Sequence, residues 1–145
     1  MADNEIVPIE IPQKKKPPII FDKDEHFRPE LTLEKLRQLP PAFIPGIGKI
    51  TAGNSSGIND GAAGMLIMSA DKAKELGLQP LAKIKAVGRG GCHPSIMGLS
   101  PVPAVKDLLK KSRLQLQDFE MIEVNEAFAA QYLACEKVTI LYNHN

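Results

Sequence analysis

The sequence has no tryptophan, few other aromatic residues and no excess of charge of either sign. Its 145 residues include two cysteines, so a disulfide framework is not expected, and the two cysteines and three histidines show no metal-ligand spacing. The 18 basic and 17 acidic residues lack the basic footprint of a nucleic-acid-binding protein. No apolar run approaches the roughly 20 residues of a membrane span, and residues 1–5 do not resemble a signal peptide. We therefore expect a cytoplasmic protein with no metal, membrane or nucleic-acid partner.

Strand-like and helix-like segments alternate over most of the chain. An unbroken apolar run, an alternating segment and a further apolar segment predict strands at residues 65–68, 82–87 and 119–124. Helical spacing, N-cap residues and prolines predict helices at residues 32–39, 70–76, 103–111 and 126–136. The repeated order of strand and helix favours an α/β fold with a mainly parallel sheet.

Prolines and glycines mark the segments between these elements. Residues 5–18 alternate prolines with apolar and lysine residues, which favours an extended arm. Residues 51–64 are small, polar and rich in glycine, which suits close approach of the backbone to a ligand or to another chain. Residues 88–91 lack the full spacing of a phosphate-binding loop, so we expect a flexible loop after a strand.

Asn125 and Glu126 follow the predicted strand at residues 119–124. Functional groups in open α/β sheets usually lie at this end of a strand. Asparagine is also a favoured N-cap, and glutamate suits the first turn of a helix, so a structural role explains the same two residues. Their position leaves both interpretations open.

Cys92 and His93 suggest a thiolate activated by an imidazole. Adjacent side chains in an extended segment point to opposite sides, however, and a nucleophile and its base normally come from separate segments. We therefore expect a passive cysteine in a loop at position 92. Cys135 is predicted to be a small buried apolar residue, and His26 to lie in a solvated loop.

Three longer motifs follow one another along the chain: TAGNSSGINDGAA at residues 51–63, PSIMG and PVPA within residues 94–104, and NEAFAAQ at residues 125–131. In this order they resemble the motifs of the thiolase family of acyl-CoA acyltransferases. The resemblance begins near Asp22 and ends near Lys137, and residues 24–29 resemble the family's CoA-loop region.

The resemblance implies a partial thiolase fold of the α/β class. It consists of part of the loop domain, the last strand of the N-terminal half and the first βαβα of the C-terminal half. The implied boundaries are an extended arm at 1–21, a partial CoA-loop region at 22–50, the end of the N-terminal half at 51–80, the start of the C-terminal half at 81–137, and a tail outside the family at 138–145.

The resemblance also implies an activity of fatty acid metabolism: Claisen condensation of acyl-CoA, or thiolysis of 3-ketoacyl-CoA. The CoA thioester is the substrate, and no cofactor is expected. Asn125 matches the asparagine that holds a water in the family's oxyanion hole. Ser56 matches a serine near the pantetheine arm of CoA, and Arg28 an arginine near its nucleotide end. Met97 matches a methionine that lines the acyl pocket.

The catalytic residues that the resemblance would require are absent from this sequence. The family's nucleophilic cysteine lies in an earlier segment, and its Gly-His-Pro histidine and second cysteine lie in later ones. Cys92 and His93 stand where the family has other residues, so neither inherits a catalytic role.

Three hypotheses remain for a chain with these motifs and without those catalytic residues. The first is a truncated thiolase-type acyltransferase that is inactive alone. The second is a non-catalytic module that binds CoA or pairs with another thiolase-like chain. The third is a chain that does not fold stably, because absent strands remove burial that must offset chain entropy.

Overall fold

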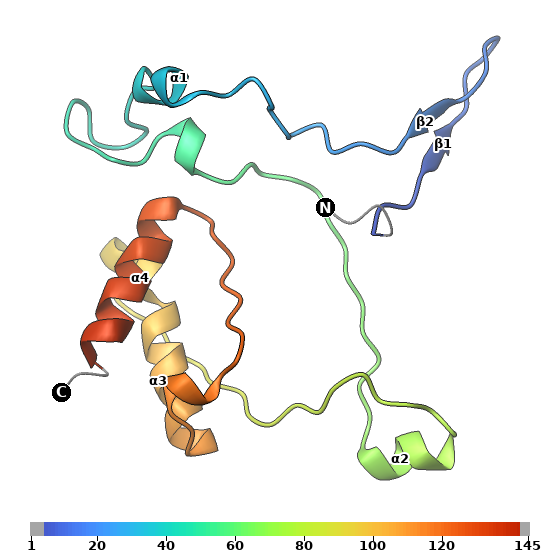
Figure 1. Cartoon of the computed structure of the whole chain (residues 1–145), viewed down its shortest axis with the longest axis vertical. Coiled ribbons are helices and arrows are strands. Elements are labelled where there is room, and N and C mark those ends of the chain that lie inside the picture. The colour runs from blue at the N-terminus through green and yellow to red at the C-terminus, as the bar shows by residue number, and fades with distance from the viewer. Residues whose placement is uncertain (1–4, 143–145) are drawn as a thin grey trace. The chain divides into compact units, whose positions relative to one another are not determined.

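The computed structural model describes residues 5–142. Contacts divide the chain into two units, Met1–Gln38 and Leu39–Asn145, and each unit is described by itself. Figure 1 shows the two strands β1 and β2 near the N-terminus and the helices α1 to α4 that follow them.

The first unit contains an antiparallel hairpin and one short helix. β1 (Ile9–Ile11) pairs with β2 (Ile19–Phe21), and Ile9 lies opposite Phe21. The sequence predicted an extended arm here, and the pairing of its two isoleucine-rich ends was not expected. Every side chain of both strands is exposed, and an isolated two-stranded hairpin has marginal stability. α1 (Leu33–Arg37) begins after Thr32, whose side chain accepts a hydrogen bond from Lys35 N at 3.3 Å.

The second unit contains the remaining helices. The α-helices are α2 (Ala70–Glu75), α3 (Pro101–Ser112) and α4 (Ala129–Tyr142), and the 3₁₀ turns are η1 (Ala52–Asn54), η2 (Pro94–Leu99) and η3 (Leu116–Asp118). Ser69 caps α2 by accepting a hydrogen bond from Lys72 N, and Gly77, at a φ of +64°, follows its end. The predicted helices at 70–76 and 103–111 are confirmed. α4 begins at Ala129 instead of Glu126 and continues past the predicted end at Glu136.

Helices α3 and α4 pack side by side with η2 in the second unit (Figure 1). Val102 on α3 and Cys135 on α4 are buried, and among the described apolar residues only Ala73 on α2 is buried as well. The accessible surface of the chain is 13589 Å², whereas a compact monomer of this mass exposes about 7,300 Å². Most of the apolar side chains therefore remain in contact with solvent.

The three strands predicted at residues 65–68, 82–87 and 119–124 are not formed within the described residues. Met65 and Leu66 are each 82% exposed, and Met121 is 81% exposed. A strand requires hydrogen bonds to a neighbouring strand, and none of these segments has one here. The apolar pattern of these residues is that of strands covered on both faces, and this chain does not supply the cover.

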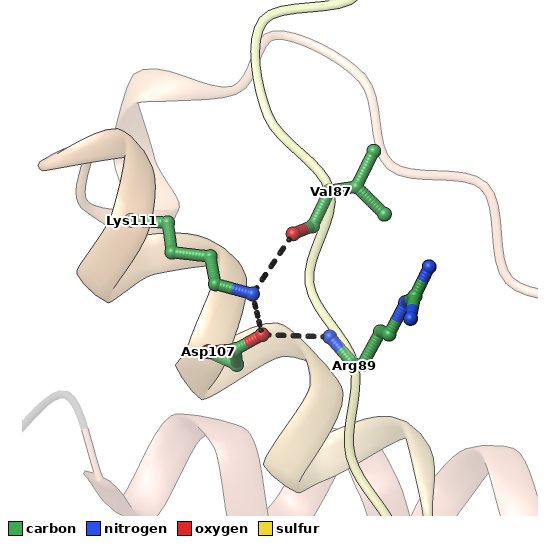
Figure 2. A network of polar contacts seen from close by, with 4 residues as sticks. All are labelled: Val87, Arg89, Asp107 and Lys111. Carbon is green, nitrogen blue, oxygen red and sulfur yellow. Dashed lines mark hydrogen bonds and ion pairs between the residues drawn. The ribbon is translucent and has the colours of Figure 1, made fainter.

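Residues 87–90 run along α3 and are tied to it by polar contacts (Figure 2). Asp107 Oδ2 lies 2.6 Å from Lys111 Nζ and accepts a hydrogen bond of 2.8 Å from Arg89 N. Lys111 Nζ also donates to Val87 O at 3.4 Å. The hydrogen bond from Lys111, and then that from Arg89 N, lowers the pKa of the Asp107 carboxyl. A charged pair on α3 therefore holds the backbone of the preceding segment.

The glycines of residues 88–91 allow this segment to approach α3 closely. A Cβ atom at Gly88 would lie 2.6 Å from Leu108 N, and one at Gly90 would lie 2.5 Å from the carbonyl carbon of Pro103. Both distances are too short for any side chain. Gly88 and Gly90 thus serve packing against a helix. The segment does not follow a strand as expected, because residues 82–87 form none within the described part of the chain.

Candidate functional site

Two of the sequence motifs meet in the second unit through Ser56. Ser56 N donates a hydrogen bond of 3.0 Å to Ala127 O, and Ser56 Oγ donates one of 3.2 Å to the same oxygen. Ser55 and Phe128 form an antiparallel bridge, and the Phe128 ring meets Phe43 edge to face with centroids 6.3 Å apart. The motif at 51–63 and the motif at 125–131 are therefore neighbours in space although Ser56 and Ala127 are 71 positions apart.

The polar residues before Ser56 hold their own turn together. Thr51 Oγ1 accepts from Gly53 N at 3.2 Å, and Asn54 Oδ1 accepts from Thr51 N at 2.8 Å. Asn54 Nδ2 donates to Lys49 O at 2.8 Å, and Ser55 Oγ donates to Thr51 O at 2.7 Å. These reciprocal caps shape η1 and set the direction in which the chain leaves it toward Ser56.

Asn125 lies in the exposed segment that leads to α4. Its carbonyl accepts a hydrogen bond from Ala127 N at 3.1 Å, and among the described residues no hydrogen bond holds its carboxamide. Asn125 does not cap a helix and Glu126 does not lie in a first turn, because α4 begins at Ala129. The structural interpretation of this pair is therefore wrong, and the Asn125 carboxamide remains available to a ligand two residues from the carbonyl that binds Ser56.

Met97 lies on η2, and its side chain is 69% exposed. Ser100 Oγ donates to Met97 O at 2.7 Å and stabilises the turn. The turn rests on α4, because Cys135 Sγ donates to Gly98 O at 3.2 Å and a Cβ at Gly98 would touch Gln131. Met97 is thus presented from a turn supported by the helix that follows Asn125.

The side chains of Cys92 and His93 have separate partners. Cys92 Sγ lies 3.1 Å from Ile96 O, to which it donates, and 3.2 Å from Ser100 Oγ. The His93 ring accepts from Ser95 N at 3.3 Å and lies 2.8 Å from Ser95 Oγ. The two side chains thus bond to different partners, and the absence of a catalytic dyad stays a prediction.

Cys135 is buried on α4, as predicted. Burial, and then the neighbouring Cys92, raises the pKa of the Cys135 thiol. A thiol in these surroundings is a poor nucleophile at neutral pH.

Arg28 belongs to the first unit, whereas Ser56, Met97 and Asn125 belong to the second. Arg28 is exposed, and its carbonyl accepts from Leu31 N at 3.2 Å. His26 in the preceding loop is exposed, which confirms the prediction of a solvated histidine, and its backbone N–H donates to Asp24 Oδ1 at 2.9 Å.

An apolar cavity that the motifs did not predict lies between α3, α4 and the segment at 116–124. Its volume is about 270 Å³, and its lining includes Val102, Val105, Ile122, Val124 and Tyr132. Val124 directly precedes Asn125, so one wall of the cavity leads into the polar segment of the candidate site. The signal in the sequence was the spacing of apolar residues on α3, which places them on one face of that helix.

The described residues, 5–142, contain neither a metal-ligand cluster nor a membrane-spanning helix. Within that range no group of three or more histidine, cysteine or acidic side chains could hold a metal ion. None of the helices in the same range is both long and apolar enough to cross a membrane.

Two family models match almost the whole chain. The model of the thiolase N-terminal domain matches residues 2–71, and that of the thiolase C-terminal domain matches residues 78–143. The matches extend over the arm before Asp22 and over most of the tail after Lys137, where the motifs had indicated no resemblance. The domain boundaries stay predictions, and residues 1–4 and 143–145 lie outside the described part of the chain.

Curated relatives and solved structures agree with the family models. Probable acetyl-CoA acyltransferases of Staphylococcus epidermidis (strain ATCC 12228) and Staphylococcus aureus (strain NCTC 8325) are 53% and 55% identical to this chain, over 93% of it and 34% of their own length. The crystal structure of the Bacillus anthracis acetyl-CoA acetyltransferase matches with 51% identity and a TM-score of 0.84, over 95% of this chain and 34% of that one. Human mitochondrial 3-ketoacyl-CoA thiolase in complex with CoA matches with 49% identity and a TM-score of 0.79, over 92% and 32%.

Together with these matches, the helices, the turns and the pairing of the two motifs indicate part of an α/β protein that has an N-terminal and a C-terminal domain. The chain belongs to the thiolase family, and the predicted partial thiolase fold is confirmed. It spans about a third of the length of the curated relatives it matches.

Proposed function

We propose that this chain supplies substrate-facing segments of a thiolase-type acyl-CoA C-acyltransferase, which condenses acyl-CoA molecules or cleaves 3-ketoacyl-CoA with CoA. The observation that carries the proposal is the pair of hydrogen bonds from Ser56 to Ala127 O. This contact brings the serine expected near the pantetheine arm beside the segment of the asparagine expected at the oxyanion.

Each proposed residue has a side chain suited to its role. The Asn125 carboxamide can orient a water that donates to the developing oxyanion, a contribution worth on the order of a hundredfold in rate. Met97 offers a flexible apolar surface to an acyl chain. Arg28 offers a cation that can form paired hydrogen bonds with a CoA phosphate. The CoA thioester is the substrate, and the proposed chemistry needs no cofactor.

We propose further that the chain alone does not catalyse acyl transfer. A covalent acyl intermediate requires an activated thiolate. Cys92 is held by a carbonyl and a hydroxyl group, and Cys135 is buried with a raised pKa. Neither thiol has a histidine as a partner in the described structure.

Thiolysis of acetoacetyl-CoA by the purified chain tests the proposed inactivity. The expected rate in the presence of CoA equals that of the buffer blank. Turnover comparable to that of an intact thiolase would contradict the proposal, and loss of that turnover in Cys92→Ser or Cys135→Ser would identify the responsible thiol.

Calorimetric titration with CoA tests the proposed contact to substrate. We expect Ser56→Ala to weaken binding severalfold, because the hydroxyl helps to place the loop beside Ala127. Ser112→Ala is the matched control, since Ser112 Oγ also donates to a backbone carbonyl, Leu109 O at 3.3 Å, but lies on α3 outside the candidate site. Equal affinities of the two variants for CoA would show that Ser56 does not contribute to the binding site.

A second candidate function is a non-catalytic module that binds CoA or pairs with another thiolase-like chain. The exposed apolar segments at 65–68 and 119–124 favour pairing, because each has the pattern of a strand without its partner. Size-exclusion chromatography of the chain mixed with an intact thiolase distinguishes the candidates. Co-elution of the chain with the intact thiolase would support a pairing module. Separate elution, together with CoA binding by the chain, would support the first candidate function.

A further inference from the structure

Both cysteine side chains contact the same short turn. Cys92 directly precedes His93, the N-cap of η2, and its thiol donates to Ile96 O at 3.1 Å. Cys135 lies on α4, and its thiol donates to Gly98 O at 3.2 Å. Carbonyl groups two residues apart cannot be separated by more than about 7 Å, so η2 brings the two thiols into one neighbourhood.

The two thiols differ in access to solvent. Cys92 is half-buried in a loop, whereas Cys135 is 8% exposed. Burial, and then the charge of Cys92, raises the pKa of the Cys135 thiol, as expected for two thiols that contact the same turn. A reagent from solvent can therefore reach Cys92 first, and Cys135 is the only other cysteine of the chain.

We propose that Cys92 and Cys135 form a redox pair that a small-molecule disulfide, such as oxidised glutathione, converts into an intramolecular disulfide. The Cys92 thiol loses its proton to solvent, and the thiolate attacks one sulfur of the oxidant. This step forms a mixed disulfide and releases one thiol. The Cys135 thiol then gives up its proton and attacks the Cys92 sulfur, and the departing second thiolate takes up that proton and leaves as a thiol. Two protein thiols are oxidised by two electrons, and one oxidant molecule is reduced to two thiols.

The disulfide would join the loop before η2 covalently to α4. This bond replaces the two weak thiol–carbonyl hydrogen bonds with a covalent cross-link that restricts the chain. Met97 then lies on a turn that follows directly after the cross-linked Cys92. The formation of the bond is independent of the proposed acyltransferase function, since it requires only the two thiols and the oxidant.

Treatment of the full, reduced chain with oxidised glutathione under native conditions tests the pair. Intact mass after alkylation should show the loss of two hydrogens, about 2 Da, and no alkylated thiol. In Cys135→Ser the reaction should stop at one glutathione adduct on Cys92, and Cys92→Ser should be modified more slowly than Cys135→Ser because the remaining thiol is buried. Stable glutathione adducts on the wild-type chain, or disulfide-linked dimers, would overturn the proposal.

Two cysteines on one chain can also form a disulfide without any help from the fold. Comparing the rate of disulfide formation in the native and the unfolded chain separates this case from the proposal. The second step should be roughly tenfold or more faster in the native chain than in guanidinium, because the fold raises the effective concentration of Cys135 at Cys92. Equal rates in the two conditions would show that the fold does not bring the thiols together, and would overturn the proposal as well.

Discussion

Helices α3 and α4 bury apolar side chains against each other, whereas the strand-like segments at 65–68 and 119–124 leave theirs in solvent. Val102 and Cys135 are 7% and 8% exposed, and Met65 and Met121 are 82% and 81% exposed. A helix satisfies its backbone hydrogen bonds within one segment, but a strand needs a neighbour. The difference shows which parts of a thiolase-like fold this chain can form from its own residues.

The largest loss of stability is expected where residues 87–90 approach α3 closely. Gly90→Val places a branched side chain where a Cβ alone would lie 2.5 Å from the carbonyl carbon of Pro103. We expect the free energy of unfolding of the second unit to fall by about 1–3 kcal/mol or more. Urea denaturation followed by circular dichroism measures it.

Gly61→Val is the control for this substitution, because a Cβ at Gly61 would meet no atom within 4 Å. The control should change stability by less than about 0.5 kcal/mol. Similar losses in both variants would show that the segment does not pack on α3.

Truncation of the small core should have the next largest effect. Val102→Ala removes two buried methyl groups between α3 and α4, and we expect a loss of about 1.6 kcal/mol from the transfer free energy alone. Leu81→Ala should have almost no effect on the thermal midpoint, because Leu81 is fully exposed. If the two variants melt at the same temperature, the contact between α3 and α4 does not contribute to stability.

The smallest expected effect concerns the charge that ties residues 87–89 to α3. The hydrogen bond from Lys111 and then that from Arg89 N lower the pKa of Asp107 in the folded chain below its ordinary value of 3.8. A lowered folded pKa stabilises the fold above the unfolded pKa, and this stabilisation is lost as the pH falls through the folded value. Wild type should therefore lose stability below about pH 4 relative to Asp107→Asn.

Glu75→Gln provides the comparison for the acid titration. Glu75 forms an exposed pair with Lys72 within α2 and holds no other segment. Its substitution should leave the acid-induced loss of stability in place. A wild-type profile that coincides with that of Asp107→Asn at every pH would contradict the role given to Asp107.

The helices could be predicted from the sequence because their signals are local. Ser69 and Gly77 limit α2, and the prolines of the first turn mark α3, so these helices lie where the sequence placed them. The start of α4 was placed too early because Asn125 has the residue type of a cap. Ser55 bridges to Phe128 and Ser56 binds Ala127 O, so these residues before Ala129 are not helical, and no local signal predicts such a contact.

The strands were predicted from an apolar pattern that describes burial, and burial depends on neighbours that this chain does not provide. Likewise, the spacing of Gly88 and Gly90 is itself typical of a segment that packs closely against a neighbour on one side. Two glycines two positions apart face the same side of an extended segment, and here that side meets α3.

The candidate site could be predicted only in part. The resemblance identified Ser56, Met97 and Asn125, but the relative positions of these residues in the fold depend on long-range contacts. The meeting of the motifs at Ala127 and the support of η2 by Cys135 both depend on such contacts.

Amide-resolved NMR of the full chain with and without CoA tests the central claim most directly, because it reports folding and binding residue by residue. The account predicts dispersed signals for α3 and α4 and shifts on addition of CoA that are concentrated near Ser56, Met97 and Asn125. Collapsed signals, or a dispersed spectrum in which CoA shifts none of these residues, would contradict it.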